Sequence, residues 1–452
     1  MQKSSEGGLL SHIQFRSATA LVVANVIGAG VFTTTGFQAA DLGHPGVILL
    51  LWVLGGVLAY CGALCFAELG AAIPEAGAEY IYLRESYGRA FGFMSAFVSL
   101  IAGFSAPIAA ALKSLIHYIT AYFPSLPGDA QVIGAVTASE LAAIVCVWLL
   151  VGVHLRGREG GVAFNDVVTL LKVGGIVAII LAAAAIGNGD ASNLTYVSPA
   201  YDEMSTTSVM TAVAGSLIFV MFCYSGWNAA AYVASEIVDP QKTLPKALLV
   251  GTGIVTVLYL LLNMVYFYGA NVDELAGKVE VGLVASRTLF GEWGAGLVTV
   301  VLAVSLIASA SAMTMAGPRV YYSLGQDIRR FSALTRTNSA GAPTNALLLQ
   351  GIVATLIIVS GSVDQILSYA GFTLALMSAL AVSCVIVMRI RRPDMPRPFR
   401  VWLYPLPPLF FMAVSLWTMY WAFQGRPVES TLALLTVAAG GGIFFLAALL
   451  RR

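Results

Sequence analysis

The sequence predicts an all-α membrane protein with twelve transmembrane helices, and two observations support that class. Of the 452 residues, 58% are hydrophobic and only 10% are charged, whereas soluble domains average about 25% charged residues. The apolar residues also gather into segments of the roughly 20 residues that a helix needs to cross a bilayer. The chain is therefore expected to use lipid as its main solvent.

Twelve apolar segments follow one another along the chain. They lie near residues 17–40, 46–70, 90–122, 131–155, 162–186, 209–238, 243–270, 292–318, 343–361, 364–389, 401–423 and 430–450.

The basic residues predict the orientation of these spans. An even number of spans puts both termini on one side of the membrane. Only Lys278, Arg287 and Arg426 fall in loops on the other side, whereas the loop at 389–400 is rich in arginine. The positive-inside rule then predicts that both termini are cytoplasmic. Residues 1–16 lack the pattern of a signal peptide and are expected to remain as a cytoplasmic segment.

Composition excludes several classes of function. A net charge of +1 argues against a nucleic-acid partner. The five cysteines all lie in apolar segments and the four histidines show no metal-ligand spacing, so we expect no disulfide framework, metal or other cofactor. No nucleophile has a recognisable base beside it in the sequence, so an enzyme is not expected.

The first span contains the stretch NVIGAGVFTTTG, with Gly28 and Gly30 near its middle. Glycine inside a helix costs about 0.8–1 kcal/mol relative to alanine. Irregular backbone at membrane depth is tolerated only where it is buried in protein or lines a cavity. The two glycines therefore predict a helix break with a function, although close helix packing is an alternative explanation.

A break at this place would present two kinds of backbone group. The second half-helix would offer the N–H groups of Ala29, Gly30 and Val31 to a carboxylate, at the positive end of its dipole. The first half-helix would end with the carbonyl groups of Val26 and Ile27, which suit an ammonium group. One break could thus hold both charges of an amino acid.

The sixth span contains a second candidate break. It reads FVMFCYSGWNAAAYVASEIVDP, with Ser225 and Gly226 near its middle and Asn228 as a possible N-cap of a second half-helix. Interrupted spans at corresponding places in two halves of a chain are typical of transporters built from inverted repeats.

The repeats can be assigned from the position of the two breaks. Spans 1–5 at 17–186 would form the first repeat and spans 6–10 at 209–389 the second. The last two spans, within 401–450, would lie outside the five-plus-five core.

Three stretches together carry a resemblance to a known family. NVIGAGVF, GALCFAELGAAIPEAGAEYIYLRESYG and FCYSGWNAAAYVASEIVDPQKTLPKAL resemble the amino acid–polyamine–organocation superfamily, and are most similar to L-type amino-acid transporters and their bacterial relatives. The resemblance covers residues 12–390. It implies a secondary active transporter that moves amino acids by alternating access around a site at the membrane midplane.

The resemblance also implies which residues bind substrate. The stretch 27–30 matches the family's carboxylate-and-amine stretch, and Phe222 matches its aromatic gate. The carbonyl groups of Phe222, Cys223 and Ser225 would complete the ammonium site. Asn228 matches a polar residue of the L-type branch, where acid-resistance antiporters carry a glutamate, so that activity is not expected.

Partners and location follow from one loop. Animal L-type proteins carry a cysteine between spans 3 and 4 that is bonded to a glycoprotein, but the corresponding loop here, PSLPGDA, has none. We therefore expect no disulfide-linked partner, and a single-chain protein of a bacterial inner membrane.

Lys172 in span 5 matches a lysine that, in branches of the superfamily independent of sodium, resembles a tethered replacement for the ion. Ser309 and Ser311 on span 8 are the expected acceptors for its ammonium, together with carbonyl groups near Ala24 and Ile27. The lysine could couple a proton or support exchange, and the sequence leaves both open. A lysine extending to the cytoplasmic interface is the alternative.

Two other charged residues lie in spans. Lys113 is expected to extend toward the outer headgroups. Glu68, near the cytoplasmic end of span 2, needs only packing or a loop ion pair.

Substrate charge is limited by the scarcity of carboxylates. Neither broken span supplies an acidic partner for a basic side chain, and an unpaired buried charge is costly. A neutral amino acid is therefore expected. The alternatives are an exchanger of cationic amino acids or amines and, outside the carriers, a channel.

Overall fold

Helices make up nearly all of the regular structure in this computed structural model, which describes residues 13–75, 77–128, 130–134, 136–156 and 158–449. Within these residues, nine helical stretches are long and apolar enough to cross a membrane. Three shorter apolar helices, at Phe15–Val26, Leu170–Ile186 and Thr344–Ser360, fall in the predicted spans 1, 5 and 9. The predicted class, an all-α membrane protein, is confirmed.

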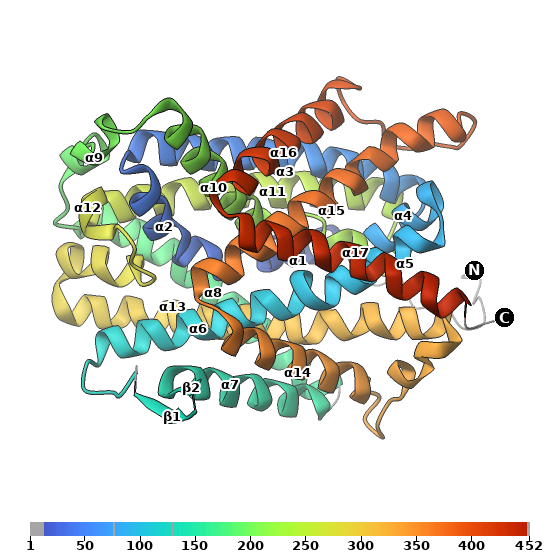
Figure 1. Cartoon of the computed structure of the whole chain (residues 1–452), viewed down its shortest axis with the longest axis horizontal. Helices are drawn as coiled ribbons and strands as arrows, with labels where there is room; N and C mark the ends of the chain where they lie inside the picture. The colour runs from blue at the N-terminus through green and yellow to red at the C-terminus, as the bar shows by residue number, and fades with distance from the viewer. Residues whose placement is uncertain (1–12, 76, 129, 135, 157, 450–452) are drawn as a thin grey trace.

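The long helices lie side by side in one bundle (Figure 1). The helix α4 (Glu79–Tyr87) and the end of α17 (Pro427–Leu449) lie at the right-hand end in this view, which we call the terminal face. The short helices α9 (Pro199–Asp202) and α12 (Val272–Leu275) lie at the other end, the opposite face.

The remaining elements give the order of the fold. In the first half of the chain they are α1 Phe15–Val26, η1 Gly30–Phe32, α2 Thr34–Leu42, α3 Pro45–Ala72, α5 Arg89–Val98, the π-helical η2 Ser99–Ser105, α6 Ala106–Tyr122, β1 Gln131–Ile133, β2 Val136–Thr137, α7 Ala138–Leu155, α8 Arg158–Ile186 and η3 Ala191–Leu194. In the second half they are α10 Thr206–Tyr224, η4 Ala229–Glu236, α11 Pro240–Gly269, α13 Val281–Asp327, η5 Arg329–Thr335, α14 Thr344–Ser360, α15 Val363–Arg391 and α16 Leu406–Gly425.

The packing of the bundle places α1 at its centre. α11 packs along both α3 and α1, and α13 packs along α6 and α8. α1 therefore has α11 on one side and contacts α13 on another. Any break in α1 is consequently surrounded by protein.

The fourth span begins later than predicted. Residues assigned to its start form the antiparallel hairpin β1–β2, which turns at Gly134 with a positive φ of 58°. The helix begins only at Ala138, because Thr137 and Glu140 form a capping box that fixes its first turn. The β-branched residues before it favoured strand over helix.

The eighth span is longer than predicted. The prediction of 292–318 covers only the middle of α13, which runs from Val281 to Asp327 and bends at Gly291, where φ is 68°. A charged and amphipathic helix end carries no continuous apolar signal, so hydropathy located only its central part.

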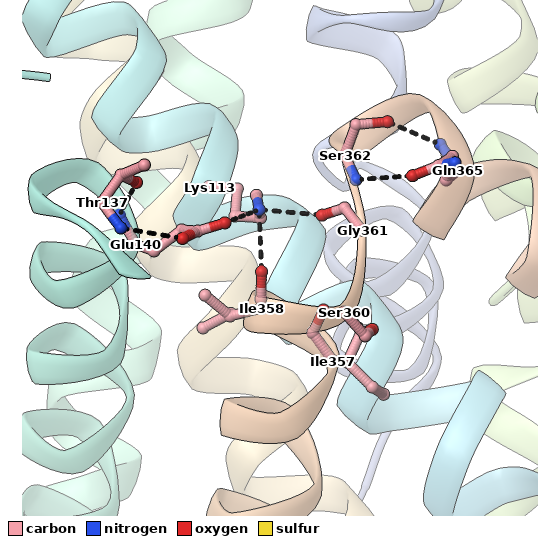
Figure 2. A network of polar contacts seen from close by, with 9 residues as sticks. All are labelled: Lys113, Thr137, Glu140, Ile357, Ile358, Ser360, Gly361, Ser362 and Gln365. Atoms are coloured by element: carbon pink, nitrogen blue, oxygen red, sulfur yellow. Dashed lines mark hydrogen bonds and ion pairs between the residues drawn. The ribbon is translucent and has the colours of Figure 1, made fainter. Parts of the chain in front are cut away.

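Lys113 does not extend to the headgroups, so that prediction is wrong. Its side chain is buried, and its Nζ atom donates hydrogen bonds to Glu140 (3.1 Å) and to the carbonyl oxygens of Ile358 and Gly361 (2.8 Å each). These acceptors come from α7 and from the end of α14 (Figure 2). Unpaired carbonyl groups at a helix C-terminus attract a cation, and here they lie within reach inside the protein.

Glu68 forms the ion pair that the sequence allowed. Its buried carboxylate accepts hydrogen bonds from Arg389 and lies 3.4 Å from Arg397, which joins α3 to the end of α15 and the loop after it.

Candidate functional site

The break predicted in span 1 is present. α1 ends at Val26, Ile27 adopts an extended conformation, and η1 begins at Gly30. Within the described residues, the N–H groups of Ala29, Gly30 and Val31 donate no hydrogen bond. Buried N–H groups are rarely left unpaired in folded proteins. These three are therefore available to an anionic group.

The break predicted in span 6 is also present. α10 ends at Tyr224, Gly226 has a φ of 111°, and η4 begins at Ala229 as a 3₁₀ helix. A positive φ of this size favours glycine over any residue with a Cβ atom. Sequence and backbone thus agree on the reason for Gly226.

The two breaks face each other at close range. A Cβ atom on Gly226 would lie 3.1 Å from the backbone of Asn25, and one on Gly30 would lie 2.4 Å from the Sγ atom of Cys223. The glycines are therefore needed for close approach as well as for backbone freedom. Close helix packing and a binding site are compatible explanations of the glycines, because close packing brings the backbone groups of the two breaks together.

Most of the carbonyl groups predicted to bind an ammonium already accept hydrogen bonds. Tyr259 of α11 donates to Val26 (2.6 Å) and Cys223 (3.0 Å), and Phe222 accepts from the N–H group of Ser225 (2.9 Å). Tyr259 was not predicted as a site residue. Span 7 contains several tyrosines, and nothing in the sequence distinguishes this one.

Lys172 belongs to α8, and its fully buried side chain reaches the C-terminal end of α1. Its Nζ atom donates to the carbonyl oxygens of Ala24 (2.7 Å) and Ile27 (2.8 Å) and to Ser309 (3.4 Å). The hydroxyl of Ser309 also donates to Ile27 (3.1 Å). The sequence predicted these contacts for the lysine. The alternative prediction, that its side chain extends to the cytoplasmic interface, is wrong.

Ser311 was predicted beside Lys172, but it lies elsewhere. Its hydroxyl is 3.0 Å from the Nε2 atom of His154 on α7. Residues two positions apart on a helix face different directions, so Ser309 and Ser311 could not both meet one amine.

Asn228 does not cap the second half-helix, so that prediction is wrong. Its side chain makes no capping hydrogen bond and instead donates to the carboxylate of Glu79 (3.0 Å). Tyr232 also donates to this carboxylate, at 3.5 Å. Burial at the terminal face, outside the spans, raises the pKa of Glu79 to about 7.

Glu79 was missed by sequence reasoning. It lies in the loop motif that carried the resemblance, but two other glutamates, Glu75 and Glu85, lie within ten residues of it. Only the fold shows that this one meets span 6.

Phe222 lies against Gly30 and is 5% exposed. Its ring is 3.3 Å from the place of a Cβ atom on that glycine. The ring thus lies beside the first break. Among the described residues, no cluster of three His, Cys, Asp or Glu side chains could hold a metal.

The structure has two broken helices, and their free backbone groups lie close together inside a membrane bundle. This arrangement agrees with the family that the motifs suggested. Comparison with known proteins decides the family. The profile described as "Amino acid permease" matches residues 13–445. This chain belongs to that family. As an amino acid permease, it is a membrane transporter of amino acids and not an enzyme.

Several relatives of this permease match over almost the whole chain. The b(0,+)-type amino acid transporter 1 of Mus musculus is 30% identical, over 97% of this chain and 87% of its own length. The large neutral amino acids transporter small subunit 2 of Oryctolagus cuniculus is 26% identical, with 98% and 82% covered. The Asc-type amino acid transporter 1 of Mus musculus is 26% identical, with 98% and 82% covered.

Proposed function

We propose that this permease carries neutral amino acids by alternating access, with the substrate bound where the two broken helices meet. The observation that carries the proposal is the set of unpaired N–H groups at Ala29, Gly30 and Val31. They suit the substrate carboxylate at the positive end of the second half-helix. The carbonyl groups of Phe222 and Ser225, each with a second lone pair, suit the ammonium group.

The proposal for a neutral side chain rests on charge. Glu79 is the carboxylate that contacts the broken span 6, and it already accepts hydrogen bonds from Asn228 and Tyr232. A basic side chain in the site would need a carboxylate of its own. The printed name of one relative, a transporter of large neutral amino acids, supports the same substrate class.

We propose that transport is independent of sodium. Lys172 supplies a fixed ammonium to the carbonyl groups of Ala24 and Ile27 and to Ser309, so no mobile cation is needed there. The cycle would then be driven by a proton or by exchange for a second amino acid.

Architecture and location are proposed as follows. Residues 17–186 and 209–389 form two inverted repeats, with spans 11 and 12 outside them. The terminal face is cytoplasmic and the membrane is a bacterial inner membrane. The loop at 124–130 contains no cysteine, so we propose that no disulfide-linked subunit is attached, in contrast to the subunit named in one relative.

Two measurements test the proposed function. Thermal stability of the purified protein in the presence of each of the twenty amino acids and several amines identifies the ligand class, because a ligand that binds only the folded state stabilises it. Uptake into proteoliposomes then separates a carrier from a channel, since unlabelled amino acid should compete with saturable uptake. Stabilisation by amines and basic amino acids alone would favour the cationic alternative.

A further inference from the structure

Arg426, which follows α16, joins three helices toward the opposite face. Its side chain is 21% exposed, with its Nη1 atom 2.5 Å from Asp364 near the start of α15 and its Nη2 atom 3.3 Å from Asp41 near the end of α2. Its guanidinium also lies over the ring of Phe219 on α10, 4.9 Å from the centroid. One cation is therefore shared by two carboxylates and an aromatic ring.

A cleft of about 450 Å³ lies beside this arginine, between α2, α10 and the end of α16. Asp41 and Arg426 supply its charged lining, and Thr207, Ser208 and Thr211 of α10 supply hydroxyl groups. The other lining residues are alanines and glycines, which leave room between the helices. Small-molecule sites commonly have volumes of about 300–1,000 Å³, so the cleft is large enough for an amino acid.

The charges around the cleft do not cancel. Asp41 and Asp364 share one guanidinium, and Asp364 has the shorter contact, so Asp41 lacks a full counter-ion. Arg426 also keeps one donor, because its Nε atom makes no hydrogen bond within the described residues. This Nε atom lies toward the cleft, 3.9 Å from the place of a Cβ atom on the lining residue Gly215. The cleft thus presents a carboxylate and a cationic N–H donor together.

The cleft lies on the same face of α10 as the proposed substrate site. Gly215, Phe219 and Phe222 follow one another at spacings of four and three residues, and residues so spaced share one helix face. Gly215 precedes Phe222 by about two helical turns, or about 10 Å along the axis. Between them, the ring of Phe219 packs against Phe37 of α2, with centroids 5.7 Å apart. In the proposed orientation the cleft is therefore on the outer side of the two breaks.

We propose that this cleft is a second, outer site for the transported amino acid, in which Asp41 accepts from the ammonium and the Nε atom of Arg426 donates to the carboxylate. A cation alone would leave the arginine donor unpaired, and an anion alone would face the carboxylate of Asp41. A zwitterion satisfies both groups with charge-assisted hydrogen bonds.

The inference rests on the proposed function and adds to it a place where substrate binds before it passes Phe219. A phosphatidylethanolamine headgroup joins the same two charges and is the other source of this chemistry. The experiment therefore includes an arm for each source.

The number of amino acids bound per chain tests the outer site. Equilibrium dialysis is carried out on the permease in nanodiscs of phosphatidylcholine, whose headgroup has no N–H donor. The probe is the radiolabelled neutral amino acid that stabilises the protein most in the thermal screen. Gly215→Leu fills the cleft from a position where a Cβ atom would meet only Arg426. Gly253→Leu is the matched control, a glycine of α11 with no atom within 4 Å of the place of its Cβ atom.

The unmodified permease and Gly253→Leu should bind two amino acids per chain, and Gly215→Leu one. Asp41→Asn, which leaves the pair of Arg426 and Asp364 in place, should weaken one of the two sites about tenfold, the range of a hydrogen bond to a charged group. One bound amino acid in the unmodified permease, two in Gly215→Leu, or unchanged affinities in Asp41→Asn would overturn the inference. Loss of the second amino acid when phosphatidylethanolamine replaces phosphatidylcholine would assign the cleft to the lipid headgroup and overturn it as well.

Failure of the outer site can be told from failure of the proposed function. Gly30→Ala, which disrupts the site at the breaks, should retain only the amino acid in the cleft. A single bound amino acid that is lost in Gly30→Ala and kept in Gly215→Leu overturns the outer site alone. A single one that is kept in Gly30→Ala and lost in Gly215→Leu overturns the binding of substrate at the breaks.

Discussion

The Nζ atom of Lys172 lies 2.8 Å from the carbonyl oxygen of Ile27, the first residue after α1. The same amine donates hydrogen bonds to Ala24 and to Ser309, so α8 is tied to both α1 and α13 through one side chain. If the first half-helix moves relative to α13, either these hydrogen bonds break or Lys172 moves with the half-helix. We therefore expect changes at the lysine to affect the opening of the proposed site.

If Lys172 takes the place of a sodium ion as proposed, replacing sodium by choline should leave uptake unaltered. Lys172→Ala should reduce uptake severely, at least about tenfold, since it leaves buried carbonyl groups without a donor. Initial uptake rates in proteoliposomes of equal protein content measure both effects. Strict sodium dependence of the unmodified permease would contradict the assignment. A fully active Lys172→Ala would remove the proposed cause of sodium independence.

Variants of two serines on α13 distinguish the effect of contact with the lysine from the effect of burial alone. Ser309→Ala should lower the uptake rate, because its hydroxyl contacts both Lys172 and Ile27. Ser311→Ala is the matched control, since this equally buried serine contacts His154 instead. The expected loss for Ser309→Ala is about threefold, the range of one hydrogen bond. Equal losses in the two variants would argue that α13 merely tolerates no alanine at either position.

The helix breaks and the lysine could be predicted because each violates a rule of membrane helices. Gly28 and Gly30 are unfavourable in a helix, and a charge at the position of Lys172 is costly in lipid. Tyr259 and Glu79 violate no such rule. A tyrosine in an apolar span and a glutamate in a polar loop are ordinary residues, and only tertiary contacts make them different. The prediction that Lys113 reaches the headgroups failed for the same reason. Its acceptors come from α7 and from the end of α14, which are far away in sequence.

Gly30→Ala should abolish uptake, whereas Gly28→Ala should retain it. A Cβ atom at position 30 would collide with the sulfur of Cys223 at 2.4 Å, and one at position 28 would meet only the carbonyl oxygen of Val26 at 3.8 Å. Alanine at 30 must therefore push the two breaks apart. Uptake and the amount of folded protein, from size-exclusion chromatography, are measured together. Loss of folded protein in Gly30→Ala would favour a packing role alone, and full uptake would exclude a close approach of the breaks.

Phe222→Ala should slow turnover more than it weakens binding. The ring lies against Gly30, and excluding water from the N–H groups there would strengthen their electrostatic interactions with a carboxylate. A lid acts on occlusion of the substrate and therefore on the rate of the cycle. Equilibrium binding, from ligand-dependent thermal stability, should change less than the maximum uptake rate. Equal losses in both quantities would indicate a core aromatic residue, and an unchanged rate would refute the lid.

The buried carboxyl group of Glu79 should make the stability of the terminal face depend on pH. Burial raises its pKa from 4.5 to about 7, so the folded protein binds a proton that the unfolded chain has already lost between these values. Stability is therefore full below the lower pKa, falls as pH rises toward 7, and levels off above it. At about 1.4 kcal/mol per pKa unit, the total change is on the order of 3 kcal/mol.

Glu79→Gln isolates this dependence from the other carboxylates. Glutamine keeps an acceptor for Asn228 but cannot ionise, so the melting temperatures of variant and unmodified protein should be similar near pH 5 and diverge by pH 8, where the variant becomes the more stable. Glu75→Gln is the control, because this exposed glutamate of the same loop lies 3.6 Å from Arg84 in a surface ion pair, which contributes little to stability. The divergence should be confined to Glu79→Gln. A constant difference between Glu79→Gln and the unmodified protein across this range would show that Glu79 ionises freely in the folded state, in contradiction to its burial against Asn228 and Tyr232.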